Sequence, residues 1–327
     1  RCISRAKSAA LVCVASISLF TGGCIGGKGA TPVTAYELKN YNQDLYQGKL
    51  YAEELCVAQN DVALEGYTED TELHSAALFD LTGERVLYSY KAHERLYPAS
   101  TTKIMTALLA IENANLDDQV TISGNADASS FSADAQVCGL AKGEVWTLRD
   151  LLGALLLYSG NDAATAIAEY VGGSEEAFVN MMNRRAQELM ANGTHFMNPH
   201  GLHDDNHYTT AYDLYLIFNE CIKHEDFVNI IQSEAYTAYY TDVDGNSQEA
   251  LFTPTNLYAQ GEVDVPENVT IVGGKTGTTD EAGYCLILME KDSSDNPYIS
   301  IVMGASEKPV LYEDMTSLIE AIPSGQQ

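Results

Sequence analysis

Residues 97–109 read Tyr97-Pro98-Ala99-Ser100-Thr101-Thr102-Lys103-Ile104-Met105-Thr106-Ala107-Leu108-Leu109. Apolar residues recur at helical spacing through the second half of this stretch, which predicts a buried helix. Ser100 is a residue type that favours the N-cap, so we expect it to begin the helix. Lys103 follows three residues later and falls on the same helix face.

A serine hydroxyl beside an amine places a nucleophile next to a base. The N-terminus of a helix adds partial positive charge and free backbone N–H groups, which suit a developing oxyanion. Ser-x-x-Lys also occurs by chance in most chains of this length. Other motifs must therefore decide whether Ser100 and Lys103 are catalytic.

The composition describes a strongly acidic chain of 327 residues, with 18 Lys and Arg against 46 Asp and Glu and a net charge of −28. Such a charge disfavours nucleic acid and anionic membrane surfaces as partners, and it is typical of a solvated acidic surface. The length and the 46% of hydrophobic residues suffice for one large domain or two small ones.

The N-terminal residues have the pattern of a secretory signal peptide. Arg1, Arg5 and Lys7 precede an uncharged apolar run over residues 9–20, which is too short for a comfortable membrane span. We expect residues 1–23 to form the signal peptide. The protein is then exported and extracytoplasmic.

Small residues lead from this run to Cys24 and resemble a bacterial lipobox, in which Cys24 would be lipidated. Thr21 stands where a Leu is usual, so ordinary cleavage near the same place remains the alternative. Residues 24–66 are expected to form a flexible, Gly-rich tether and a polar extension. Contact with a membrane is expected only through this N-terminal part.

Four cysteines remain in the exported chain after Cys24: Cys56, Cys138, Cys221 and Cys285. They allow three disulfide connectivities, between which the sequence does not choose. In a domain of this size the absence of any bridge is an equal alternative. Cys285 lies in an apolar run and is expected to be buried.

The periodicity places strands at both ends of the main domain and helices between them. We expect a hairpin over residues 74–90, turning at Asp80-Leu81-Thr82-Gly83. This arrangement predicts one sheet completed by distant segments, with a helical lobe inserted in it. The expected helices are 148–157, 162–170, 174–190, 210–221 and 314–321, and the expected late strands are 283–289 and 298–304.

Three motifs stand in order along the chain: Ser100-x-x-Lys103, Ser159-Gly160-Asn161 and Lys275-Thr276-Gly277. The first is expected to open a helix, the second to join two helices and the third to end a strand. The same trio, with Asp in place of Gly160, is typical of β-lactamases and penicillin-binding proteins. Each motif alone is weak evidence, but the ordered set is specific.

The residues that flank the motifs favour one family among the proteins that carry this trio. Residues 97–107, 159–164 (Ser-Gly-Asn-Asp-Ala-Ala) and 198–202 (Asn-Pro-His-Gly-Leu) resemble the serine D-alanyl-D-alanine carboxypeptidases, the low-molecular-mass penicillin-binding proteins. The resemblance covers about residues 70–321.

This resemblance implies an α+β fold of the β-lactamase/DD-peptidase type, an antiparallel sheet flanked by helices. We place the catalytic domain at 67–321 and its helical lobe at about 97–231. Residues 322–327 are expected to be a short tail, too short for the C-terminal β-rich domain that many relatives carry.

The resemblance also implies a role for each motif residue. Ser100 attacks the bond between two terminal D-alanines of a peptidoglycan stem peptide, Lys103 takes its proton, and Ser159 relays a proton to the leaving nitrogen. No cofactor is implied, and β-lactams would be covalent inhibitors. The residues expected to bind substrate are Asn161, Lys275, Thr276, Gly277 and Thr278, with the N–H groups of Ser100 and Thr278 as the oxyanion hole.

Three other readings remain open. A β-lactamase would need a deacylating Glu, and Glu176 imitates that motif, but it lies close to Asn161 in sequence and within an amphipathic helix. The histidines of residues 200–207 have metal-ligand spacing, although loop histidines that hydrogen-bond to the backbone explain them as well. A non-catalytic penicillin-binding sensor would carry the same motifs.

Overall fold

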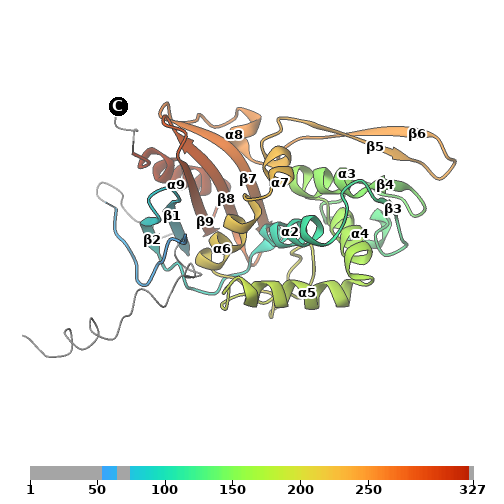
Figure 1. The fold of residues 1–327 in the computed structure, drawn as a ribbon, viewed down its shortest axis with the longest axis horizontal. Coiled ribbons are helices and arrows are strands. Elements are labelled where there is room, and N and C mark those ends of the chain that lie inside the picture. The colour runs from blue at the N-terminus through green and yellow to red at the C-terminus, as the bar shows by residue number, and fades with distance from the viewer. Residues whose placement is uncertain (1–53, 65–73, 324–327) are drawn as a thin grey trace, which may run out of the picture. The chain divides into compact units, whose positions relative to one another are not determined.

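The computed structural model describes residues 54–64 and 74–323 (Figure 1). The predicted signal peptide, Cys24 and most of the predicted tether lie outside these residues. Within them, no helix has both the length and the apolar character needed to cross a bilayer.

An antiparallel five-stranded sheet, in the order β2-β1-β9-β8-β7, carries Lys275, Thr276 and Gly277 in its edge strand β7. The predicted hairpin is confirmed as β1 and β2, and the side chain of Asp80 accepts a hydrogen bond from the N–H of Gly83 at 2.8 Å within its turn. The first strand pairs with the last, so distant segments complete one sheet, as expected. The bounds are β1 (Ser75–Asp80), β2 (Arg85–Tyr90), β7 (Val269–Thr279), β8 (Gly283–Asp292) and β9 (Pro297–Ala305).

The central strands of this sheet are buried on both faces. In β9, Ile299, Ile301 and Met303 point into one core, while Tyr298 and Val302 point into the other. This follows from the period of two along a strand. Helix α9 (Lys308–Glu320) covers the second face, and the remaining large helices lie beyond the first (Figure 1). The sheet is therefore the middle layer between α9 and the helical lobe.

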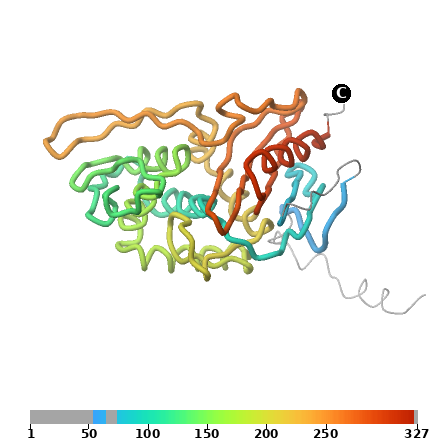
Figure 2. The backbone as a smooth tube through the Cα atoms, turned by 180° about the vertical axis from the view of Figure 1, so that it is seen from behind, coloured from blue at the N-terminus to red at the C-terminus, as the bar shows by residue number. Residues whose placement is uncertain are grey.

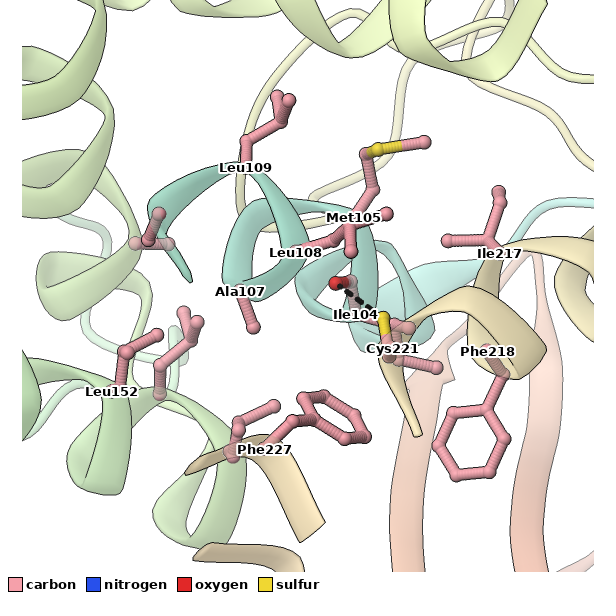
Figure 3. Close-up of a cluster of buried hydrophobic side chains, with 14 of the residues drawn as sticks. Ile104, Met105, Ala107, Leu108, Leu109, Leu152, Ile217, Phe218, Cys221 and Phe227 are labelled. Carbon is pink, nitrogen blue, oxygen red and sulfur yellow. Dashed lines mark hydrogen bonds between the residues drawn. The ribbon is translucent and has the colours of Figure 1, made fainter. Parts of the chain in front are cut away.

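Helix α2 (Lys103–Asn113) runs through the centre of the lobe, and eight consecutive residues from Lys103 to Ala110 are buried. Figure 3 shows Ile104, Met105 and Leu108 surrounded by side chains of other helices, with the Sγ of Cys221 donating to the carbonyl oxygen of Ile104 at 3.6 Å. A helix that is buried on all sides over two turns is a core element. This packing fixes the helix that carries Lys103.

The other helices largely match the expected ones. The C-terminal helix begins earlier than predicted, and α7 was not predicted separately. Their bounds are α3 (Leu148–Gly153), continued by a π-helical turn (Ala154–Tyr158), α4 (Asn161–Gly172), α5 (Glu175–Glu188), α6 (Ala211–Cys221), α7 (Glu225–Ile231) and α8 (Leu257–Gln260).

A second antiparallel sheet, which the sequence did not predict, lies within the lobe. Its order is β3-β4-β5-β6, with β3 (Gln119–Thr121), β4 (Val145–Thr147), β5 (Tyr236–Thr241) and β6 (Ser247–Phe252). Strands β5 and β6 form a long hairpin beside α3 (Figures 1 and 2). The Trp146 ring stacks on Tyr240 at a centroid distance of 4.2 Å and attaches the hairpin to the lobe.

The described part of the predicted extension, residues 54–64, packs on the catalytic domain. The backbone N–H of buried Cys56 donates to the hydroxyl of Tyr215 at 2.9 Å, and Val62 forms a β-bridge with Ser89. The four cysteines of the described residues, Cys56, Cys138, Cys221 and Cys285, carry free thiols, and Cys285 is buried, as expected.

Candidate active site

Ser100 lies in a short 3₁₀ turn, Ala99–Thr102, that leads directly into α2. The prediction that Ser100 is the N-cap of the helix is therefore wrong, since Thr102 occupies that position. The turn is held by the carbonyl oxygen of Pro98, which accepts from the N–H and the hydroxyl of Thr101 at 3.2 and 2.7 Å. Ala99 has a φ of 47°, a strained conformation in the left-handed region that non-glycine residues rarely adopt.

Lys103 begins α2 and is fully buried. Its Nζ lies 3.0 Å from the Oγ of Ser100, 2.7 Å from the Oδ1 of Asn161 and 2.6 Å from the carbonyl oxygen of His200. Burial, and next the positive charge of Lys275, hold the pKa of Lys103 well below its usual range. A neutral amine has two N–H donors for the two obligate acceptors. Its lone pair is then left for the hydroxyl proton of Ser100.

Ser159 and Asn161 come from the turn between the π-helical segment and α4, as predicted. Ser159 caps the segment with a φ of 70°, in the left-handed region that non-glycine residues rarely adopt. Such strain concentrates at functional sites. Asn161 opens α4, and its N–H donates to the carbonyl oxygen of Gln136 at 2.8 Å.

Lys275, Thr276 and Gly277 lie in the interior of β7, so the prediction that they end the strand is wrong. The strand continues to Thr279 because its pairing with β8 continues to that residue. The Nζ of buried Lys275 donates to the Oγ of Ser159 at 2.8 Å and to the carbonyl oxygen of Thr276 at 2.9 Å. Burial lowers the pKa of Lys275 to about 7.

Strand β7 is an edge of the main sheet. It passes beside the 3₁₀ turn Ala99–Thr102, which contains Ser100 and is called the serine turn below. A Cβ on Gly277 would lie only 2.9 Å from the carbonyl oxygen of Pro98 and 3.0 Å from the backbone nitrogen of Ser100. Glycine is therefore required where the strand meets the turn. The hydroxyl groups of Thr276 and Thr255 hydrogen-bond at 2.6 Å, a contact that the sequence did not suggest.

A cleft of about 710 Å³ opens over these motifs. Lys103 and Lys275 are buried behind its surface. The predicted residues that line it are Ser100, Ser159, Asn161, Thr276, Gly277 and Thr278. Lining residues that the sequence reasoning missed include Ser132, Asp134, Gln136, Thr255 and Lys308.

The loop of residues 198–202 contacts Lys103 through the carbonyl oxygen of His200. The side chain of Asn198 accepts from the N–H of Gly201 at 2.7 Å and donates to the carbonyl oxygen of Leu202 at 2.9 Å. A Cβ on Gly201 would lie 1.9 Å from the carbonyl oxygen of Ala99. The loop thus packs against the serine turn through a position that only glycine fits.

Two histidines of this stretch, His200 and His207, hydrogen-bond to the backbone, as the alternative to a metal site expects. Nδ1 of His200 accepts from the N–H of Leu202 at 3.2 Å, and Nδ1 of His207 accepts from the N–H of Met197 at 3.0 Å. Burial lowers the pKa of His200 to about 3 and that of His207 to about 4. Both rings are therefore neutral structural groups.

Glu176 lies exposed in the first turn of α5 and does not line the cleft. Its placement matches the expected surface helix residue. It is not positioned to activate a water molecule over Ser100.

Comparison with known proteins agrees with this geometry. The D-alanyl-D-alanine carboxypeptidase family profile matches residues 63–307. The chain is 34% identical over 254 residues to D-alanyl-D-alanine carboxypeptidase DacF of Bacillus subtilis, and 31% identical over 249 residues to DacC of Escherichia coli. These alignments cover 76% and 74% of this chain but only 61% and 59% of those relatives.

A shorter relative and its solved structure match over most of their length. The D-alanyl-D-alanine carboxypeptidase of Streptomyces sp. strain K15 is 32% identical, with 71% of this chain and 81% of that protein aligned. The crystal structure of Streptomyces K15 DD-transpeptidase superimposes with a TM-score of 0.71 at 28% identity, covering 78% of this chain and 98% of that one. The predicted DD-peptidase-like α+β fold is confirmed. The chain belongs to the D-alanyl-D-alanine carboxypeptidase family.

Proposed function

We propose that the protein is a D-alanyl-D-alanine carboxypeptidase that removes the terminal D-alanine from peptidoglycan stem pentapeptides through an acyl-enzyme on Ser100. The contact between Ser100 and the buried Lys103 carries this proposal. Because the chain spans about three fifths of the length of DacF and DacC, family membership alone does not establish the activity.

In the proposed reaction, Oγ of Ser100 attacks the carbonyl carbon between the two D-alanines while neutral Lys103 accepts the hydroxyl proton. The N–H groups of Ser100 and Thr278 stabilise the oxyanion. Ser159, held by Lys275, passes a proton to the leaving nitrogen, and D-alanine departs. Water then hydrolyses the ester. β-Lactams form the same ester when their ring opens.

The substrate is proposed to lie as an added strand along β7, whose outer edge faces the cleft. Because Oδ1 of Asn161 is bonded to Lys103, its amide NH₂ remains for the substrate backbone. Lys275 and the hydroxyl of Thr276 attract the terminal carboxylate. Exposed Lys308 lines the same cleft and adds a second positive charge at the surface.

Release of D-alanine from a synthetic stem pentapeptide tests the activity. We expect the parent protein to release one D-alanine per pentapeptide and Ser100→Ala to release none. A parent that binds penicillin covalently but releases no D-alanine would be a sensor rather than an enzyme. Rapid turnover of penicillin would instead favour a β-lactamase.

We further propose that residues 1–23 direct export, and that lipid on Cys24 attaches the protein to the membrane through the tether of residues 24–66. The support is the sequence pattern, together with an acidic surface that offers no attraction to anionic lipids. Cell fractionation of Cys24→Ala tests the attachment. Unchanged membrane association, with no lipid mass on the parent N-terminus, would contradict it.

A further inference from the structure

One wall of the cleft has no regular secondary structure. Residues 132–140 contain neither a helix nor a strand, yet Ser132, Asp134, Ala135 and Gln136 line the cleft. A loop is mobile unless other groups hold it. The position of this wall must therefore come from contacts with the rest of the domain.

The side chain of Asp162 holds three backbone N–H groups of the wall. It is fully buried in the first turn of α4, directly after Asn161. Its carboxylate accepts hydrogen bonds from three consecutive backbone N–H groups of the wall, those of Cys138 at 2.9 Å, Gly139 at 2.9 Å and Leu140 at 3.1 Å. It also accepts from the N–H of Ala163 at 2.9 Å.

Further contacts tie the same wall to the turn that carries Ser159. Gln136 accepts from the N–H of Asn161 through its carbonyl oxygen, and its side chain donates to the carbonyl oxygen of Tyr158 at 3.3 Å. A Cβ on Gly160 would lie 2.2 Å from the Sγ of Cys138. The wall therefore rests directly on the second catalytic motif.

We propose that Asp162 is a positioning residue that fixes the 132–140 wall over the Ser159-Gly160-Asn161 turn and so sets the width of the substrate cleft. The proposal rests on the proposed peptidase function, because it names how that site holds its peptide. Asp162 acts through backbone groups and does not touch the reacting atoms.

A carboxylate suits this task because it only accepts hydrogen bonds and offers about four lone-pair sites. An amide in its place would present an NH₂ group to N–H groups of the wall and leave buried donors unpaired. Asp162→Asn therefore removes the clamp with almost no change in volume. Asp213→Asn is a matched control, since Asp213 is buried in the first turn of α6 and bonded to Thr194 and Thr210 but does not line the cleft.

The experiment measures amide hydrogen exchange, thermal stability and the kinetics of D-alanine release for both variants. For Asp162→Asn we expect exchange at Cys138, Gly139 and Leu140 to become roughly tenfold faster or more. We expect KM for the pentapeptide to rise about fivefold or more, with a smaller fall in kcat. Asp213→Asn should change neither the exchange of these amides nor KM.

Two results would overturn the proposal. One is unchanged exchange at the three amides. If exchange is unchanged and only the pH dependence of acylation shifts, Asp162 acts through the charge of Lys103 and does not position the wall. The other is an equal rise in KM for Asp213→Asn at a matched loss of thermal stability. If Asp162→Asn does not fold, Asp162→Glu keeps the charge on a longer side chain and should show the same faster exchange.

The exchange measurement needs no substrate. A parent that releases no D-alanine would contradict the proposed function while leaving the clamp testable by exchange and by the rate of penicillin acylation.

Discussion

The Nζ of Lys103 lies 3.0 Å from the Oγ of Ser100, while two oxygen atoms that can only accept, from Asn161 and His200, take up its other hydrogen-bonding directions. Because burial favours the neutral amine, the geometry directs its lone pair toward the serine. The neighbouring cation Lys275 lowers the pKa of Lys103 further and holds Ser159. In the proposed reaction, both lysines therefore serve the same proton path.

The pH dependence of acylation should report the charge of Lys275. Acylation needs neutral Lys103, so its rate falls as the pH decreases through the pKa of that amine. Below its own pKa of about 7, Lys275 is cationic and opposes protonation of Lys103. Removing this charge in Lys275→Met should raise the pKa of Lys103 and move the acid limb to higher pH.

The measurement is the rate of penicillin acylation against pH by stopped flow. Lys275→Arg keeps the charge and serves as the control, whose acid limb should stay nearer that of the parent. An acid limb for Lys275→Met that coincides with the parent would show that the two lysines are not coupled.

Substitution of Gly201 should disturb the serine turn. Its φ is +91°, and a Cβ there would overlap the carbonyl oxygen of Ala99. We expect Gly201→Ala to lower the free energy of unfolding by about 2 kcal/mol or more and to slow acylation roughly tenfold or more. Chemical denaturation and penicillin labelling measure the two effects.

Gly173→Ala is the control for backbone strain alone, since Gly173 has a φ of +78° with open space around its Cβ position. Gly173→Ala should lower the free energy of unfolding by about 1 kcal/mol and leave the rate of acylation unchanged. Equal acylation rates for the two variants would mean that the loop of residues 198–202 does not support Ser100.

The acyl-enzyme formed with penicillin should persist, because Glu176 lies on α5 and does not line the cleft. Glu176→Gln should therefore leave D-alanine release and the release of bound penicillin unchanged. The decay of a fluorescent penicillin adduct follows the release of bound penicillin, and assay of free D-alanine follows cleavage of the pentapeptide. A trapped adduct in Glu176→Gln that the parent clears quickly would support a β-lactamase.

Lys308 should contribute to recognition of the terminal carboxylate. We expect Lys308→Ala to raise KM for the pentapeptide by about three- to tenfold, since an exposed charged contact is worth about 1 kcal/mol. A pentapeptide with an amidated C-terminus should be cleaved equally, and slowly, by parent and variant. Equal KM values for the free acid would exclude this role.

The motifs that meet at the candidate site were predictable because each motif is local. Ser100 and Lys103 are one turn apart, and the order of the three motifs is specific even though each is weak. The distances between motifs needed the structure, since Lys275 and Ser159 meet only when β7 packs beside the lobe. The two wrong details, Ser100 as the N-cap and Lys275-Thr276-Gly277 as the end of a strand, both came from residue preferences that tertiary contacts override.

The features that the sequence did not predict leave little trace in the residue pattern. Strands β3 and β4 have three residues each, too few for a periodic pattern. The carbonyl oxygen of His200 and the N–H groups of residues 138–140 are backbone atoms, whose positions follow from the fold and not from side-chain identity. Asp162 was visible beside Asn161, but its task depends on a loop more than twenty residues away.

The most direct measurement is the site of the penicillin adduct, found by mass spectrometry of proteolytic peptides. The adduct should lie on Ser100, in the peptide that contains residues 97–103, and Ser100→Ala should fold normally and carry none. An adduct on another residue of the parent, or a labelled Ser100→Ala protein, would contradict Ser100 as the nucleophile.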